Sequence, residues 1–282
     1  MNIIYLFCFV ILVFCWIWLL PILCICIFFS VPFALFFLST SIMISLTLQW
    51  WFHGQVTPNT WLRQWVNCCP WYEWFPCNRI SIHETSIIAV HPHGLLCCGA
   101  LAGIHFIPGS QTVFCVAPLL FYIPILGWCI RALGCIPARY DIMSGALKQG
   151  FSVIVVPGGV PELVSAETGD DCQTVQRSGF LRLAHEINVK VHCVFVKGEC
   201  ATFTMWKAPF HDQRVQMSLK SNIPFVFPMF LGWYGTWLPK RVPLFLNIRR
   251  IETYDKQEYY LQLQHLQKKN KALKISKESL KL

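Results

Sequence analysis

The first fifty residues are almost entirely apolar. From Ile3 to Leu48 the run is interrupted only by Pro21, Ser30-Val31-Pro32 and Ser39-Thr40-Ser41. Its length is about twice the roughly 20 residues that one helix needs to cross a bilayer core, and no interruption is a polar loop suited to water. The pattern predicts a tight helical hairpin, over about 3–27 and 32–50, that crosses the membrane twice or dips in and returns.

Beyond a tryptophan-rich junction that suits a membrane–water interface, short apolar or β-branched runs alternate with helical stretches. The candidate strands are Ile87–Val90, Thr112–Val116, Ser152–Val156, Lys190–Lys197 and Pro243–Ile248. The candidate helices are Leu95–Ile104, Pro118–Leu133, Ile142–Gln149 and Arg177–Ile187. This alternation predicts an α/β fold with a largely parallel sheet.

The distribution of charged residues divides the chain close to the end of the apolar segment. Asp, Glu, Lys and Arg are absent from Met1 to Leu62, so the net charge of +9 falls on the rest. A secretory signal peptide would have a basic start and a shorter apolar core, so we interpret 1–62 as a membrane anchor and its interfacial junction. We expect residues 63–254 to form the α/β domain. In residues 255–282, the seven-residue spacing of Leu266, Leu273 and Leu280 predicts a basic amphipathic helix on the domain or the membrane.

The basic balance favours contact with anionic lipid headgroups and phosphate-bearing substrates. Nucleic acid is not an expected partner, because no zinc-finger, helix-turn-helix or RNA-binding aromatic motif is present. The 15 cysteines include adjacent pairs and four residues in the apolar anchor, which is unlike a disulfide framework. We therefore expect reduced cysteines that serve as small apolar side chains.

Polar motifs follow three of the predicted strands. His91-Pro92-His93-Gly94 follows the first strand, Pro157-Gly158-Gly159-Val160-Pro161-Glu162 follows another, and Gly198-Glu199 follows a third. The carboxyl ends of neighbouring parallel strands meet at one edge of a sheet, where ligands bind. Histidines at i and i+2 of an extended segment point to the same side, and an imidazole can act as a base near neutral pH. The motifs are thus expected to converge on one crevice.

The same motifs, in this order and approximate spacing, resemble those of the diacylglycerol acyltransferase type 2 / monoacylglycerol acyltransferase family. The resemblance runs over about 74–248, from Trp74-Phe75-Pro76 through the motifs above and Arg177-Ser178-Gly179-Phe180 to Pro239–Pro243, and the apolar hairpin is also similar. Two departures are Trp74, where the family usually has tyrosine, and His192, where it has proline. The resemblance implies a glycerolipid-acyltransferase-like domain that transfers an acyl group from acyl-CoA, as co-substrate, to a glyceride hydroxyl.

Within that reaction, we expect His93 to be the base that removes the hydroxyl proton, with His91 as the close alternative. Glu162 is expected to hold the imidazole and to stabilise the imidazolium. Backbone N–H groups near Gly94 or in Gly158-Gly159 are candidates for an oxyanion hole. No Gly-x-Ser-x-Gly motif is present, which argues against the usual hydrolase arrangement.

The remaining candidates concern the donor and the surroundings of the site. Arg177, Arg139 and Arg182 are the basic residues best placed in sequence to meet the phosphates of coenzyme A, although each could be a surface arginine or an ion-pair partner. Glu199 is expected either to support the site or to cap a helix. No cofactor or metal is expected. A zinc site of His91, His93, Cys97 or Cys98 and Glu162 is the alternative, but it leaves the other motifs without a role.

The acceptor is expected to be membrane-dissolved diacylglycerol, which would give triacylglycerol; monoacylglycerol and a long-chain wax alcohol are alternatives. Because acyl-CoA is cytosolic, we expect an endoplasmic reticulum membrane protein whose catalytic domain faces the cytosol, with the lipid droplet as a further location. A non-enzyme alternative is an inactive hairpin scaffold on lipid droplets. Acyl-chain preference and homo-oligomer formation stay open.

Overall fold

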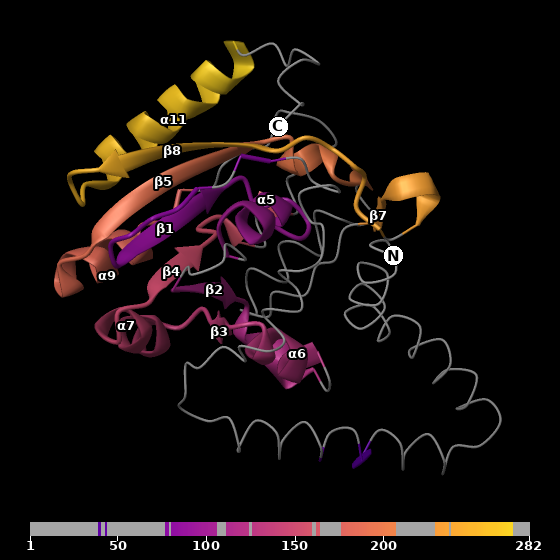
Figure 1. Ribbon diagram of the computed structural model, residues 1–282, viewed down its shortest axis with the longest axis horizontal. Coiled ribbons are helices and arrows are strands. Elements are labelled where there is room, and N and C mark those ends of the chain that lie inside the picture. Colours follow the sequence, from indigo (N-terminus) through magenta and orange to yellow (C-terminus); the bar gives the residue numbers. More distant parts are fainter. Residues whose placement is uncertain are drawn as a thin grey trace. The chain divides into compact units, whose positions relative to one another are not determined.

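The contacts of the chain divide it into two units, Met1–Pro70 with Val113–Ala146, and Trp71–Thr112 with Leu147–Leu282. The computed structural model describes residues 39, 40, 43, 77, 78, 80–105, 111–123, 126–159, 162–163, 176–206, 229–236 and 238–272 (Figure 1). Apart from three positions, the predicted hairpin lies outside these residues. Among the residues described, no helix has the length and apolarity needed to cross a membrane. The predicted boundaries at 62 and 254 stay predictions.

Parallel strands form the centre of the second unit (Figure 1). β1 (Ser86–His91) pairs in parallel with β4 (Ser152–Val155) on one side and with β5 (Lys190–Lys197) on the other. β8 (Phe245–Ile251) runs antiparallel to β5. The strands predicted at these places are confirmed, with small changes in their ends, and so is the α/β class with a largely parallel sheet.

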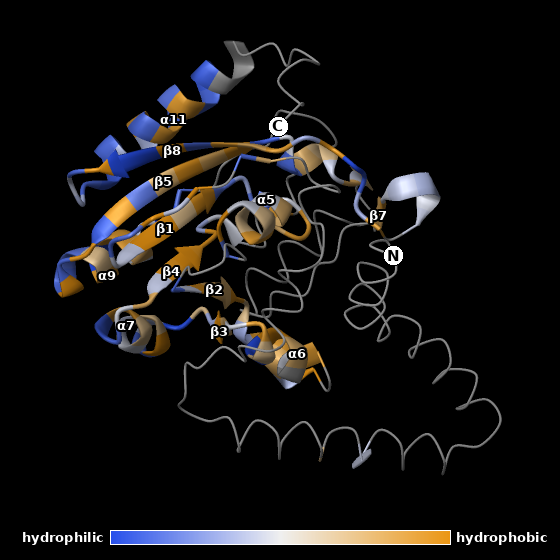
Figure 2. Cartoon of the chain, in the orientation of Figure 1, coloured by the Kyte–Doolittle hydropathy of each residue, from blue (hydrophilic) through white to orange (hydrophobic). Residues whose placement is uncertain are grey.

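Residue type explains the different positions of these strands. Every residue of β1 and β4 is buried, and both are rich in β-branched side chains, as expected for strands covered on both faces. β8 instead exposes Arg249 and Arg250, and Figure 2 shows the hydrophilic colour along part of this strand. Charged side chains are common on edge strands, where they discourage pairing with another chain.

Helices cover both faces of this sheet. α9 (Gly179–Ile187) and α11 (Lys256–Ala272) lie on one face, where the rings of Phe180 and Tyr259 have centroids 5.1 Å apart. On the other face lie α5 (Cys98–Ala100) and the π-helical turn η1 (Leu101–His105). Glycine permits this contact, because a Cβ on Gly103 would collide with Leu246 of β8. The sheet is therefore sandwiched between two helical layers.

The C-terminal helix was predicted from its leucine spacing, and α11 confirms it as far as Ala272. Tyr259, Tyr260, Leu263 and Leu266 are buried, so the described part of the helix lies on the domain. Leu273 and Leu280 lie outside the described residues.

A short antiparallel pair of strands was not predicted. It consists of β6 (Thr204–Trp206) and β7 (Met229–Leu231), with one-turn 3₁₀ helices before and after it, η3 (Glu199–Ala201) and η4 (Trp233–Gly235). Phe203 and Phe230 pack edge to face at 5.4 Å between ring centroids. Strands of three residues are too short to leave an alternating pattern in the sequence.

Most of a parallel pair of strands, β2 (Thr112–Val116) and β3 (Cys135–Pro137), and of the following helix α7 (Tyr140–Lys148) belongs to the first unit. The single helix predicted over Pro118–Leu133 is wrong. Instead, the chain forms the 3₁₀ helix η2 (Pro118–Tyr122) and, later, α6 (Leu126–Ala132). Ile123 is extended, with φ −75° and ψ 119°, because proline at the next position disfavours a helical conformation in the residue before it.

The helix predicted over Leu95–Ile104 also begins later than expected. Gly94 (φ 46°) and Cys97 (φ 51°) adopt left-handed conformations, which a right-handed helix cannot contain. The chain consequently forms turns up to Cys97, and α5 begins only at Cys98.

Seven of the described cysteines are free thiols: Cys77, Cys97, Cys98, Cys115, Cys129, Cys135 and Cys193. All but Cys77 are buried, as expected for small apolar side chains. Cys200 takes part in a disulfide bond, so the prediction of reduced cysteines is wrong at that position.

Candidate active site

The carboxyl end of β1 carries the histidine pair. His91 is the last residue of β1 and is completely buried, whereas His93, two residues later, is only partly buried. The next residue, Gly94, has φ 46°, and a Cβ at this position would lie 2.6 Å from the side chain of Glu199. Only glycine meets both conditions without strain.

Glu162 connects the two histidines. The segment that follows β4 brings its carboxylate to the end of β1, where the residue is 1% exposed. Its Oε1 lies 3.4 Å from Nδ1 of His91, and its Oε2 accepts a 2.9 Å hydrogen bond from the backbone N–H of His93. Gly158 allows this approach, since a Cβ there would overlap the carboxyl group of Glu162. The carboxylate therefore faces the His91 ring, whereas it holds His93 through the main chain.

Tyr259 of α11 occupies the other side of His91. Its hydroxyl lies 3.0 Å from Nε2 of His91, and the side chain is completely buried. The Glu162 carboxylate can only accept, so Nδ1 of His91 carries the ring hydrogen and donates to it. Nε2 is then the acceptor of the Tyr259 hydroxyl, whose pKa burial raises well above its ordinary value. Both ring nitrogens of His91 are thus engaged by the protein.

The His93 ring has a different environment. Its Nδ1 lies 2.6 Å from the carbonyl oxygen of Gly94, which can only accept, so Nδ1 carries the hydrogen. The unprotonated nitrogen is therefore Nε2, which forms no hydrogen bond with any residue the structure describes. Burial lowers the pKa of His93, while the Gly94 carbonyl and the charge of Glu162 oppose this shift. A neutral imidazole with one open nitrogen suits a general base.

Glu199 forms the second buried carboxylate. It follows β5 and accepts 2.8 Å hydrogen bonds from the backbone N–H groups of Cys98 and Gly99 at the start of α5. Burial raises the pKa of Glu199 to about 7, although these two donors partly oppose the shift. Glu199 thus fixes the turn that follows His93 by binding the first N–H groups of the helix.

The predicted oxyanion-hole glycines differ in their backbone hydrogen bonds. The N–H of Gly159 donates to the carbonyl of Val156 at 3.3 Å. Among the described residues, the N–H groups of Gly94 and Gly158 donate to no backbone carbonyl outside helices and strands. Gly94 and Gly158 are therefore the better placed of the predicted donors.

The three arginines predicted to bind the coenzyme A phosphates differ in their surroundings. The backbone N–H and carbonyl of Arg177 bind the hydroxyl of Tyr260 at 2.7 and 2.8 Å, and the Tyr260 ring centroid is 6.4 Å from that of His91. Arg182 is exposed on α9 and pairs with Glu186 at 3.7 Å. Arg139 belongs to the first unit and pairs with Asp141 at 2.8 Å. The structure brings only the Arg177 segment to the histidines of its own unit.

The alternative zinc site can be compared with this geometry. Nδ1 and Nε2 of His91 face Glu162 and Tyr259, and Nδ1 of His93 faces a carbonyl. Within the described part of the chain, no three residues of the types that bind metals are grouped as a metal site requires.

Sequence reasoning missed Tyr259. The residue is separated from His91 by 168 positions and lies in a helix that is polar overall. The local signal was the aromatic pair Tyr259-Tyr260 with Leu263 and Leu266 at helical spacing, which marks a buried face.

An α/β domain with a histidine pair and two buried carboxylates at the carboxyl ends of parallel strands has the groups of an acid–base enzyme. The model of the diacylglycerol acyltransferase family matches residues 26–249. The chain belongs to this family.

Two relatives and one solved structure are similar to the chain. Diacylglycerol O-acyltransferase 1 of Eremothecium gossypii is 26% identical over 166 residues, which cover 55% of this chain and 36% of the relative. Diacylglycerol O-acyltransferase 2 of Danio rerio is 25% identical over 158 residues, 50% of this chain and 44% of the relative. The chain thus matches less than half the length of either. The 1-acyl-sn-glycerophosphate acyltransferase PlsC from Thermotoga maritima aligns over 91% of this chain and 97% of its own, with a TM-score of 0.46 and 16% identity.

Proposed function

We propose that the protein is a membrane-bound, acyl-CoA-dependent O-acyltransferase that transfers a fatty acyl group to the hydroxyl of diacylglycerol and forms triacylglycerol. The observation that carries the proposal is the open Nε2 of His93, whose tautomer is set by the Gly94 carbonyl. Membership of the diacylglycerol acyltransferase family supports the choice of donor and acceptor.

In the proposed reaction, Nε2 of His93 removes the proton of the acceptor hydroxyl as the oxygen attacks the thioester carbon. The carbonyl oxygen gains negative charge, and the N–H groups of Gly94 and Gly158 are the proposed donors to it. When the C–S bond breaks, the coenzyme A sulfur leaves as a thiolate. The His93 imidazolium returns the proton to that sulfur, so the enzyme ends the cycle unchanged.

Glu162 stabilises the imidazolium state of His93 in this scheme. Its carboxylate raises the pKa of His93 against the effect of burial and holds the backbone of the same residue. His91, with both ring nitrogens engaged, is the proposed positioning residue that orients Glu162. Transfer of the proton to His93 is then favoured by a negative charge that is already in place.

Arg177 is the proposed contact of the coenzyme A phosphates, because the Tyr260 hydroxyl anchors its backbone beside the histidines. Arg139 and Arg182 remain weaker candidates, since each would have to leave an ion pair with Asp141 or Glu186. A guanidinium binds phosphate through two parallel hydrogen bonds.

The apolar residues 1–62 are the proposed anchor, and they support a location in the endoplasmic reticulum membrane with the domain in the cytosol. A lateral opening to the bilayer would spare an apolar acceptor the cost of transfer into water, about 0.8 kcal/mol per CH₂. Monoacylglycerol and long-chain alcohols are the alternative acceptors, and an inactive scaffold is the non-enzyme alternative.

The test is a transfer assay on membranes that contain the full chain. Labelled acyl-CoA is supplied with diacylglycerol, monoacylglycerol, a long-chain alcohol or a sterol, and the products are resolved. We expect labelled triacylglycerol as the main product and its loss in His93→Ala. His265→Ala, at an exposed histidine of α11, is the matched control and should be unaffected. Absence of product with every acceptor would overturn the proposal, and a different main product would change the acceptor.

A further inference from the structure

Exposed aromatic side chains gather at the turn that follows β7. Leu231, Trp233 and Tyr234 are 40%, 39% and 86% exposed, and they lie within four residues of one another. We call residues 231–236, which include η4, the aromatic turn. Among the residues that the structure describes, nine large hydrophobic side chains are exposed, so three of them in one turn form a cluster and differ from scattered surface residues.

The aromatic turn pairs many of its own backbone polar groups. The N–H of Gly232 donates to the carbonyl of Thr236 at 2.6 Å, and the N–H of Trp233 donates to the carbonyl of Leu238 at 2.6 Å. The N–H and the hydroxyl of Thr236 both donate to the carbonyl of Trp233, at 3.0 and 2.6 Å. A turn whose polar groups are paired internally can enter a layer that is poor in water at little cost.

Contacts with the domain fix the chain before and after the aromatic turn. Before it, Phe230 packs edge to face on the buried Phe203, with 5.4 Å between ring centroids. After it, the N–H of Lys240 donates to the carbonyl of Thr202 at 2.6 Å, and its ammonium group donates to the hydroxyl of Thr204. The domain therefore holds the exposed rings in a defined position.

Tyr234 has a left-handed backbone conformation, with φ 48° and ψ 36°. Tyrosine seldom adopts this conformation because of its Cβ, whereas glycine adopts it freely. The Tyr234 ring is nonetheless the most exposed of the nine large hydrophobic side chains, and its centroid lies 4.7 Å from that of Trp233. Because strained residues cluster at functional sites, we expect this exposed ring to have a use outside the fold.

The charged residues near the aromatic turn in the sequence are positive. From 229 to 251 the sequence holds four Lys or Arg residues and no Asp or Glu, and two of the four, Lys240 and Arg241, come soon after the turn. Positive charge attracts anionic lipid headgroups. Tryptophan and tyrosine favour the boundary between headgroups and hydrocarbon, because each combines an apolar ring with a polar N–H or O–H. Both features therefore indicate a lipid surface.

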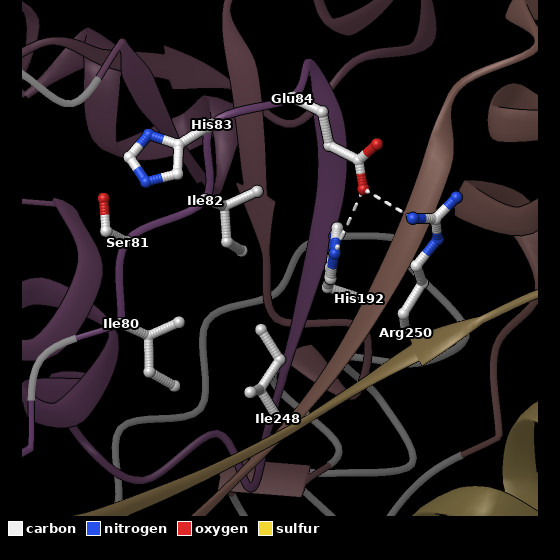
Figure 3. Close-up of a pocket in the computed structure, with 8 residues that line it drawn as sticks. All are labelled: Ile80, Ser81, Ile82, His83, Glu84, His192, Ile248 and Arg250. Atoms are coloured by element: carbon white, nitrogen blue, oxygen red, sulfur yellow. Dashed lines mark ion pairs between the residues drawn. The ribbon is translucent and has the colours of Figure 1, made fainter.

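Another exposed apolar side chain of the same unit has different surroundings. Ile248 is 38% exposed and lines a pocket of about 580 Å³ together with residues 80–84, His192 and Arg250 (Figure 3). Glu84 in this pocket lies 3.5 Å from His192 and 3.6 Å from Arg250. Ile248 thus has nearly the same exposure as the tryptophan of the aromatic turn but shares its pocket with a carboxylate, and it serves as an internal comparison.

We propose that the aromatic turn is a contact surface for an anionic phospholipid bilayer, with the rings of Trp233 and Tyr234 in the headgroup region and Lys240 and Arg241 near the phosphates. A protein partner would need roughly 20–30 residues on each side, far more than the three exposed side chains of this turn. The inference does not rest on the proposed acyl transfer, because it concerns contact with lipid and holds for any reaction of the domain.

The experiment uses the full chain in phosphatidylcholine vesicles, with or without phosphatidylserine, and a phosphatidylcholine probe that carries a diazirine at the start of one acyl chain. Labelled residues are mapped by mass spectrometry after illumination. We expect Leu231, Trp233 and Tyr234 to be labelled about fivefold more than Ile248, and about threefold more with phosphatidylserine than without it. Equal labelling of Ile248, no label on the aromatic turn, or a label that does not depend on phosphatidylserine would each overturn the proposal.

Substitution of Tyr234 then tests the exposed ring. Tyr234→Gly removes the ring and suits the left-handed conformation, so the turn should keep its fold, while labelling of Leu231 and Trp233 should fall about fivefold. Tyr234→Trp should retain the label, since tryptophan also favours the interface. Ile248→Thr is the matched control and should leave the label on the turn unchanged. Full labelling of the turn in Tyr234→Gly would contradict the proposal, and the comparison of vesicles needs no substituted protein.

Discussion

The two buried carboxylates, Glu162 and Glu199, occupy similar places and differ in what they bind. Each follows a parallel strand, is 1% exposed and reaches the segment after β1. Glu199 accepts only from the backbone N–H groups of Cys98 and Gly99, which cannot change their charge. Glu162 faces the His91 ring and holds the backbone of His93. We infer that Glu199 maintains the turn and that Glu162 takes part in the change of charge during the reaction.

The same contrast separates the two histidines. His91 has a hydrogen-bonding group on each ring nitrogen and lies completely inside the domain. His93 uses only Nδ1, and its Nε2 is the open acceptor. A base must have a free lone pair within reach of the proton that it removes, so the geometry favours His93.

The largest difference in kcat is expected between the two variants in which Glu162 or Glu199 is replaced by glutamine. Glu162→Gln removes the charge that we propose stabilises the His93 imidazolium, so kcat should fall by about 10²–10³-fold. Glu199→Gln leaves that charge in place and should lower kcat by less than about tenfold, through a looser turn. Transfer rates at saturating acyl-CoA, normalised to protein abundance in the membrane, give the comparison. Equal losses in the two variants would remove the distinction between them.

The stability of the folded protein is expected to depend on pH because of Glu199. Burial raises the pKa of Glu199 from 4.5 to about 7, so between these values the folded protein holds a proton that the unfolded chain has released. Stability from this group is complete below pH 4.5 and is lost as the pH rises through 7, by about 3 kcal/mol.

Thermal unfolding of the full chain in membranes, followed by tryptophan fluorescence between pH 5 and 8, measures this effect. The fall of the midpoint with pH should be smaller in Glu199→Gln. If the slope persists in Glu199→Gln, its source is another group.

Tyr259→Phe should have the smallest effect. The variant removes the hydroxyl from Nε2 of His91 and keeps the buried ring, so the loss of stability should be about 1 kcal/mol. Because His91 is the proposed positioning residue for Glu162, we expect only a few-fold loss of kcat. Tyr254→Phe, which removes a hydroxyl bonded to the carbonyl of Val189, is the matched control for stability. A loss of activity as large as that of Glu162→Gln would make Tyr259 part of the reaction itself.

Several parts of this arrangement were predictable from sequence. The strands β1, β2, β4 and β5 are runs of apolar or β-branched residues, which remain readable because both faces are buried. The meeting of His91, His93 and Glu162 followed from the rule that the carboxyl ends of parallel strands share one edge.

The other features of the site depend on backbone geometry and packing that could not be predicted from the sequence. The delayed start of α5 depends on the left-handed conformation of Cys97, which is unusual for that residue type. The tautomer of His93 depends on the direction of a single carbonyl, that of Gly94. Tyr259 reaches His91 only because α11 packs on β5.

Chemical rescue tests most directly whether His93 is the base. In His93→Ala the removed ring leaves space beside the Gly94 carbonyl, where added imidazole can act as a base. His91→Ala removes a positioning ring with both nitrogens engaged, so free imidazole should not replace it. We predict that imidazole restores transfer at least tenfold in His93→Ala and has no effect on His91→Ala. In the rescued variant, the fall of the transfer rate at acid pH should follow the pKa of the added imidazole. Near-normal activity of unsupplemented His93→Ala, or rescue of His91→Ala alone, would contradict the assignment and transfer the role of base to His91.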